Sequence, residues 1–514
     1  MSTDRIGPPS LSVQAFWLLF AKTLGFALTM SLPLVLVRSL SQAEFGIYKQ
    51  VFLVVGTAIT VLPLGFGMSA FYFLARQREA HGAIVLHILL VLASVGTLAA
   101  CVLALWPDLL TLLLGDRSLS PYAAEIGLVI LTWTVASFLD IVALARQDVA
   151  ASTAFIVGSQ ASRTAIFIVA AVTAGSVKAL VDAALIQGVV QTSVLLLYLK
   201  ARFPRFWMQF DWRLLQRQAS YTVPIGLSAL LLKILADLPH YFVAHAFGAL
   251  QYAIFTVGVF NLPLVGLLRE SVGSVLLPRV SRLEQEQDAP EIVGLVARAA
   301  RKLALFYFPL FVFLMVAGRE VITVLFTAQY LASWPLFAVY LLVIPFGVIV
   351  LDPITRAHAS QRFFLLRLRL VLLAVTVALL GPATRWLGLT GAVAVIVIVQ
   401  FTGTLCAGIR LSQVMHLRRH DFVQFAPLWR IGAAALLAGA VAAAVRLALG
   451  GSHPVTILAG CAAVYAVAYA GLVFAGGIIE AAEWAALRGL MPRTLRVGGG
   501  MPWASRVAFK RATR

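Results

Sequence analysis

Windows of about 20 consecutive apolar residues recur along nearly the whole sequence, and this pattern constrains the fold more than any other feature. A bilayer core about 30 Å thick is crossed by about 20 residues of apolar helix, whereas a soluble domain carries charge on about a quarter of its residues. Here 61% of the 514 residues are hydrophobic and only 12% are charged. We therefore predict an all-α polytopic membrane protein with about 14 transmembrane helices. The predicted spans are 12–37, 46–74, 83–105, 122–145, 150–174, 178–200, 218–240, 250–275, 299–317, 332–355, 363–383, 388–409, 431–449 and 455–477.

The basic residues fall into alternate loops between these spans. Of the 40 Lys and Arg residues, 29 lie in the loops or at the span ends of one side of the predicted bundle, 6 lie in those of the other side and 5 lie deeper inside spans. Because Lys and Arg accumulate on the cytoplasmic side of a membrane, both termini are predicted to be cytoplasmic. The net charge of +19 therefore indicates membrane topology, and no nucleic-acid partner is expected.

Faint internal repetition divides the chain into two related halves. The segment 44–48, Glu-Phe-Gly-Ile-Tyr, resembles the segment 251–255, Gln-Tyr-Ala-Ile-Phe, and Leu-Asp at 139–140 recurs at 351–352. Transporters are often built from such repeats, with the substrate between them. We predict two pseudo-symmetric six-helix lobes, residues 1–210 and 211–420. Residues 421–514 then hold two appended helices and a basic cytoplasmic tail.

Four cations inside the spans are predicted to bind substrate: Lys22, Lys49, Lys233 and Arg269. A Lys or Arg at mid-bilayer costs about 2.5–3.5 kcal/mol on insertion scales, so such a residue is expected to face a partner or a water-filled cavity. These four lie on the first two helices of each half, which suggests a site for an anionic substrate between the halves. The alternatives are an ion pair of Lys233 with Asp237 one turn later, and snorkelling of Lys49 and Arg269 to the membrane face.

The acidic residues Asp140, Asp237, Glu270 and Asp352 are candidates for ion coupling or for charge pairing. Structural pairing is the more frequent role of such a carboxylate. Arg163, the fifth cation inside a span, is expected to pair with Asp140 or Asp182 within one half, and contact with the substrate is the alternative.

Prolines interrupt the same helices that carry these cations, namely at Pro33, Pro63, Pro224 and Pro263, and Pro345 interrupts the tenth span. Membrane helices tolerate such breaks where the backbone lines a cavity or must flex, so the prolines mark the expected pathway. Enzyme signatures are missing from the sequence: it has no Walker A loop, no H-E-x-x-H and no G-x-S-x-G motif. We predict a protein that is not an enzyme and that needs neither a cofactor nor a metal.

Two short segments resemble sequences of a known family. The segment 37–48, Val-Arg-Ser-Leu-Ser-Gln-Ala-Glu-Phe-Gly-Ile-Tyr, lies between the first two spans, and the segment 387–392, Leu-Gly-Leu-Thr-Gly-Ala, precedes the twelfth. Both resemble the polysaccharide-biosynthesis exporters, the Wzx-type flippases of the multidrug/oligosaccharidyl-lipid/polysaccharide (MOP) superfamily. The resemblance covers residue 10 to about residue 480.

The resemblance implies a flippase of the bacterial inner membrane. Its substrate would be a polyprenyl-diphosphate-linked oligosaccharide, such as an O-antigen, capsule or exopolysaccharide repeat unit, moved to the outer leaflet by alternating access. The related murein-precursor flippases hold the diphosphate with basic residues on their first, second and eighth helices, which here carry Lys22, Lys49 and Arg269. Because two of these are Lys instead of Arg, point-charge binding is implied in place of a bidentate grip. Glycan polymerase and other assembly proteins are further candidate partners, besides the lipid bilayer.

Two other functions stay open at this level. An ion-coupled multidrug exporter of the same superfamily would share the fold, but a basic lumen suits anionic phosphate better than cationic drugs. A membrane polymerase or ligase of glycan assembly would be expected to carry a sizeable external loop, whereas the longest predicted here covers only residues 106–121.

Overall fold

The computed structural model describes residues 24–25, 28, 30–286, 288–351, 354–355 and 362–478. Within these ranges the chain is helical throughout and contains no strand. Its α-helices are α2 (Gln42–Val61), α3 (Ser69–Arg76), α4 (His81–Leu105), α5 (Asp108–Leu114), α6 (Ala123–Ala136), α7 (Phe138–Ala145), α8 (Val149–Thr173), α9 (Val177–Arg202), α10 (Trp212–Gly258), α11 (Pro263–Gln285), α12 (Ala289–Phe326), α13 (Trp334–Leu341), α14 (Val343–Phe346), α16 (Arg362–Leu387), α17 (Leu389–Val414), α18 (Pro427–Ala448) and α19 (Pro454–Ala475).

Twelve helical segments in the described part are long and apolar enough to cross a membrane, which confirms the all-α polytopic membrane fold. The first predicted span lies largely outside the described residues, although an apolar helix covers Met30–Ser39. The eighth predicted span, residues 250–275, is discontinuous. It starts in the last turns of α10, beyond a sharp turn at Gly248 (φ 75°), and it resumes as α11, whose first residue is Pro263. The helix break predicted from Pro263 is therefore present.

Local capping sets where the helices begin. The Ser41 hydroxyl accepts a hydrogen bond from the Glu44 backbone amide, and the Glu44 carboxylate accepts one from the Ser41 amide, so a capping box starts α2. The Asp211 carboxylate caps α10 in a similar way, one residue after the predicted boundary between the lobes. The division into two lobes stays a prediction.

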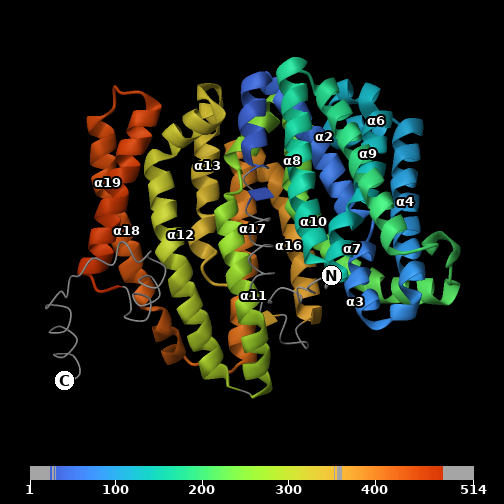
Figure 1. Ribbon diagram of the computed structural model, residues 1–514. Coiled ribbons are helices and arrows are strands. Elements are labelled where there is room, and N and C mark those ends of the chain that lie inside the picture. Colours follow the sequence, from blue (N-terminus) through green and yellow to red (C-terminus); the bar gives the residue numbers. More distant parts are fainter. Residues whose placement is uncertain are drawn as a thin grey trace, which may run out of the picture.

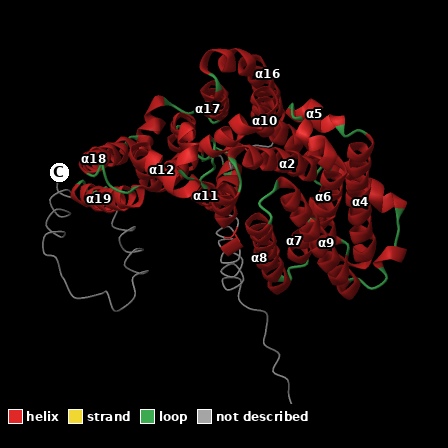
Figure 2. Cartoon of the chain, turned by 90° about the horizontal axis from the view of Figure 1, so that it is seen from above, coloured by secondary structure: helices red, strands yellow, loops and turns green. Residues whose placement is uncertain are grey.

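Helices α2 and α10 lie in the middle of the bundle when it is seen from above (Figure 2). The backbone of α10 closely approaches the first turns of α2 and the turn that follows α2. A Cβ atom added to Gly46 would lie 1.9 Å from the Ala249 carbonyl oxygen, and one added to Gly226 would lie 1.9 Å from that of Leu64. Helices α4 and α9 lie toward one end of the bundle, whereas α18 and α19 lie at the other, beside α12 (Figures 1 and 2).

The two long basic linkers of the sequence, residues 200–217 and 279–298, lie at the same edge of the bundle, the lower edge in Figure 1. Helices α11 and α12 extend beyond their neighbours at this edge. This placement agrees with the alternation of basic loops in the sequence.

Candidate functional site

Lys233 and Asp237 form an ion pair on α10. The Lys233 Nζ atom lies 2.9 Å from Asp237 Oδ2, because a spacing of four residues places both side chains on one face of the helix. The Thr57 hydroxyl of α2 donates a hydrogen bond of 2.5 Å to the same carboxylate. The local pair considered as an alternative for Lys233 is therefore present, and it also ties α10 to α2.

Lys49 is held against aromatic rings near the start of α2. Its Nζ atom lies 5.2 Å from the ring centroid of Phe45 and 5.8 Å from that of Tyr48. Such contacts stabilise an ammonium group without neutralising it. Among the described residues Lys49 has no carboxylate partner.

Arg163 on α8 lies over aromatic rings as well. The guanidinium carbon lies 4.4 Å from the ring centroid of Trp133 and 5.8 Å from that of Phe167. The expected ion pair with Asp182 is wrong, because Asp182 lies one helical turn after Lys178 and pairs with it at 2.9 Å. Asp140 lines the same cavity as Arg163, but in the described chain the two form no ion pair.

These side chains lie along α2 and on helices beside it: α10 packs against α2, and Phe167 of α8 contacts Phe52 of α2. A row of neighbouring rings, Tyr48, Phe52 and Trp133, separates the Lys49 ammonium from the Arg163 guanidinium. The Lys233–Asp237 pair lies further along the contact of α10 with α2, where Thr57 bonds to Asp237. We call Lys49, Arg163, Lys233 and Asp237 the cationic cluster. Of its three cations only Lys233 is ion-paired, so Lys49 and Arg163 have no salt-bridge partner among the described residues. The sequence analysis favoured an ion pair for Arg163 and kept contact with the substrate as the alternative, because the residue lies within a span.

The remaining predicted site residues lie elsewhere. Arg269 lies on α11, about two turns after its start, and its charge acts on Tyr307 of α12. The described contacts do not bring it to the cationic cluster. Glu270 is exposed on the same helix. Lys22 and Asp352 lie outside the described residues.

One further basic residue, near the start of the eleventh predicted span, contacts α10. Arg369 belongs to α16, and its guanidinium donates a 3.4 Å hydrogen bond to the Ser228 carbonyl of α10.

Side-chain hydrogen bonds join residues 37–42 to residues 324–329, which belong to different predicted halves. The Arg38 guanidinium donates to the carbonyls of Val324 and Leu325 at 2.7 and 3.0 Å. The Gln42 and Gln329 side chains add hydrogen bonds to backbone carbonyls across the same contact, at 2.5 and 3.3 Å. This contact lies at the end predicted to be external, so the halves are joined there.

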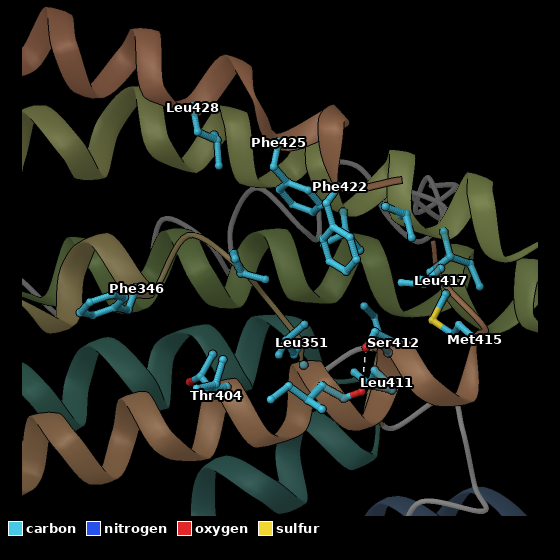
Figure 3. A pocket seen from close by; sticks show the side chains of 18 of the residues that line it. Phe346, Leu351, Thr404, Leu411, Ser412, Met415, Leu417, Phe422, Phe425 and Leu428 are labelled. Carbon is cyan, nitrogen blue, oxygen red and sulfur yellow. Dashed lines mark hydrogen bonds between the residues drawn. The ribbon is translucent and has the colours of Figure 1, made fainter. Parts of the chain in front are cut away.

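An apolar cavity of about 460 Å³ lies between α12, α14, α17 and the start of α18 (Figure 3). Phe346, Phe422 and Phe425 are among its lining side chains. Only two described lining residues, Thr404 and Ser412, carry hydroxyl groups, and both donate to carbonyls of their own helix. The cavity therefore offers almost no free polar group, so it suits a hydrocarbon chain and not a sugar or a phosphate.

Comparison with known proteins identifies a family that the sequence matches and solved structures with a similar fold. The model of a family described as "Polysaccharide biosynthesis protein" matches residues 35–335. No curated protein matches the sequence.

Three solved structures are similar over most of the chain. The first is the lipid II flippase MurJ in an inward closed conformation, with 13% identity and a TM-score of 0.71 over 91% of this chain and 100% of that one. The second is an inward-facing multidrug resistance MATE family transporter of the MOP superfamily, with 15% identity and a TM-score of 0.59 over 75% and 94% of the two chains. The third is a MOP superfamily transporter from Pyrococcus furiosus, with 14% identity and a TM-score of 0.56 over 78% and 95%. At these identities the likeness concerns the fold alone, which is that of MOP-superfamily transporters.

Proposed function

This chain belongs to the polysaccharide biosynthesis protein family, and from that premise we propose that it is a flippase for a polyprenyl-diphosphate-linked oligosaccharide. The resemblance seen in the sequence is thereby confirmed at the level of this family, and the fold is similar to that of MOP superfamily transporters. The proposed cargo is an O-antigen, capsule or exopolysaccharide repeat unit. It would cross the bacterial inner membrane from the cytoplasmic to the outer leaflet, in a protein with both termini in the cytoplasm.

The observation that carries this proposal is the excess positive charge of the cationic cluster. Each unpaired cation at mid-bilayer costs about 2.5–3.5 kcal/mol on insertion scales, so Lys49 and Arg163 are maintained at a cost that a bound anion would offset. A diphosphate supplies the opposite charge and strong hydrogen-bond acceptors. An organic cation would be repelled by the same groups, which disfavours a multidrug exporter.

Two further features support lipid transport by alternating access. The hydrogen bonds of Arg38 and Gln42 join the halves at the predicted external end, so a route to the outer leaflet requires these contacts to open. The apolar cavity beside α12 offers a surface for the hydrocarbon part of a lipid substrate.

Translocation needs no covalent chemistry, so no catalytic residue, cofactor or metal enters the proposal. The similar structures are named as a flippase and as transporters. Glycan polymerase and other assembly proteins are proposed as partners on the basis of the family.

The test is transport of a fluorescent polyprenyl-diphosphate oligosaccharide across proteoliposomes. We would compare the native protein with Lys49→Ala, Arg163→Ala, Arg269→Ala and Lys22→Ala. Lys200→Ala is the matched control, because Lys200 is exposed at the end of α9. Loss of a charge-assisted hydrogen bond to phosphate, about 1.5–3 kcal/mol, should lower transport roughly ten- to hundredfold for residues that bind the diphosphate.

The control should transport at the native rate with all variants inserted equally. If the native protein moves no such lipid from a panel of glycans but expels organic cations, it is a multidrug exporter and the proposal fails.

A further inference from the structure

A second, polar cavity of about 240 Å³ lies within the first half of the chain, between α6, α7, α8 and α9. Three glutamine amides, two serine hydroxyls, one carboxylate and one guanidinium line it. The glutamines are Gln160, Gln187 and Gln191, and the charged groups are Asp140 and Arg163. The cavity thus differs from both the cationic cluster and the apolar cavity in its chemistry.

One buried amide in this cavity has an unused hydrogen-bonding atom. Gln187 is only 1% exposed, and its Nε2 atom donates to the Ser159 carbonyl and the Ser162 hydroxyl at 3.3 and 3.1 Å. Its Oε1 atom has no hydrogen-bond partner within the described structure. A buried acceptor without a partner is destabilising, so it suits a ligand that brings a hydrogen-bond donor into the cavity.

The charges of the lining exclude simple ions. Arg163 opposes binding of a metal cation or a cationic drug, whereas Asp140 opposes binding of a second phosphate in the cavity. The opposite charges leave no net charge, which favours a neutral ligand with many hydroxyl groups. Amide side chains both donate and accept hydrogen bonds, as sugar hydroxyls do, and Trp133 and Ile59 add apolar surface for the C–H faces of a ring.

We propose that this cavity binds the sugar ring next to the diphosphate of the transported lipid. The inference rests on the proposed flippase function and specifies how the cargo is recognised. Arg163 carries the geometric argument, because it lines the cavity and stacks on Trp133, the end of the row of rings that leads to Lys49. A ligand whose phosphate lies at the cluster therefore places the sugar bonded to that phosphate at the mouth of the cavity.

The experiment measures binding of two lipids to the full-length protein in nanodiscs. One is a polyprenyl-diphosphate oligosaccharide and the other is the same polyprenyl diphosphate without sugar. Gln191→Leu removes an amide from the cavity wall, and Asp140→Asn removes the negative charge and replaces one acceptor oxygen with a donor. Using two variants guards against a folding defect in either one. Gln216→Leu is the control, since Gln216 is exposed near the start of α10.

We expect both cavity variants to bind the glycosylated lipid roughly three- to tenfold more weakly than the native protein and to bind the bare lipid equally well. Lys49→Ala should weaken binding of both lipids. Equal weakening of both lipids by the cavity variants, or no change in either, would overturn the inference while leaving the flippase proposal intact. Sodium-dependent thermal stabilisation that Asp140→Asn abolishes would identify a cation site and overturn it as well. A native protein that binds neither lipid would overturn the flippase proposal and this inference together.

Discussion

Removal of the Asp237 carboxylate should leave the Lys233 ammonium inside the membrane without a counter-charge. The two groups lie 2.9 Å apart, and their side chains are 28% exposed for Lys233 and 11% exposed for Asp237. Breaking a buried ion pair from one side costs about 3–5 kcal/mol, and the partial exposure of Lys233 favours the lower end of that range. We therefore expect Asp237→Leu to lower the free energy of unfolding by about 3 kcal/mol, which is roughly a hundredfold change in the folding equilibrium.

The double variant Lys233→Met/Asp237→Leu should recover most of this loss, to within about 1 kcal/mol of the native protein, because no charge is left unpaired. The assay is reversible unfolding in bicelles for the native protein, both single variants and the double variant, with transport measured on each. Thr57→Val keeps the ion pair and loses one hydrogen bond to the carboxylate, so it should cost less, about 1.5 kcal/mol.

Two results would refute this reasoning. If Asp237→Leu is as stable as the double variant, Asp237 does not compensate a buried charge. If the double variant is stable but no longer transports, Lys233 acts on the substrate and its pairing in this structure is only one of its states.

Three other predictions follow from contacts between the helices. Gly46→Ala should destabilise the protein by about 1–3 kcal/mol, because its Cβ would overlap a carbonyl of α10. Gly56→Ala on the same helix is the control: its Cβ meets no atom within 4 Å, so this variant should be neutral or stabilising. Thermal unfolding of both variants distinguishes the two outcomes. Arg38→Ala removes two hydrogen bonds between the predicted halves. The fraction of molecules open at the external end, measured from distances between spin labels across it, should therefore rise roughly tenfold. Unchanged distances would show that Arg38 does not hold this end closed. Arg446→Leu should cost about 3 kcal/mol of unfolding free energy by leaving the Glu320 carboxylate without its 2.9 Å partner, and a Glu320→Leu/Arg446→Leu double variant that is no more stable would count against this explanation.

Sequence alone was sufficient for the membrane class, for most of the helices and for the segments that separate them. The short turns near Arg146 and Gly175 do divide their flanking spans, with Gln147 (φ 61°) and Gly175 (φ 52°) in the left-handed region. These properties could be predicted because the length of an apolar run and the distribution of basic residues are local features, read directly against the thickness of the bilayer. The Lys233–Asp237 pair was predictable for the same reason, since both residues lie on one helix.

Tertiary structure decided which intramembrane charges meet. Arg163 stacks on Trp133, although an ion pair was expected, and Lys49 approaches it from another helix. Arg446 and Glu320 pair across 126 residues of sequence. Contacts of this kind depend on how each helix is rotated and tilted against its neighbours. A span that is apolar around its whole circumference has no polar face to show that rotation in the sequence, so only packing determines which side chains share a cavity.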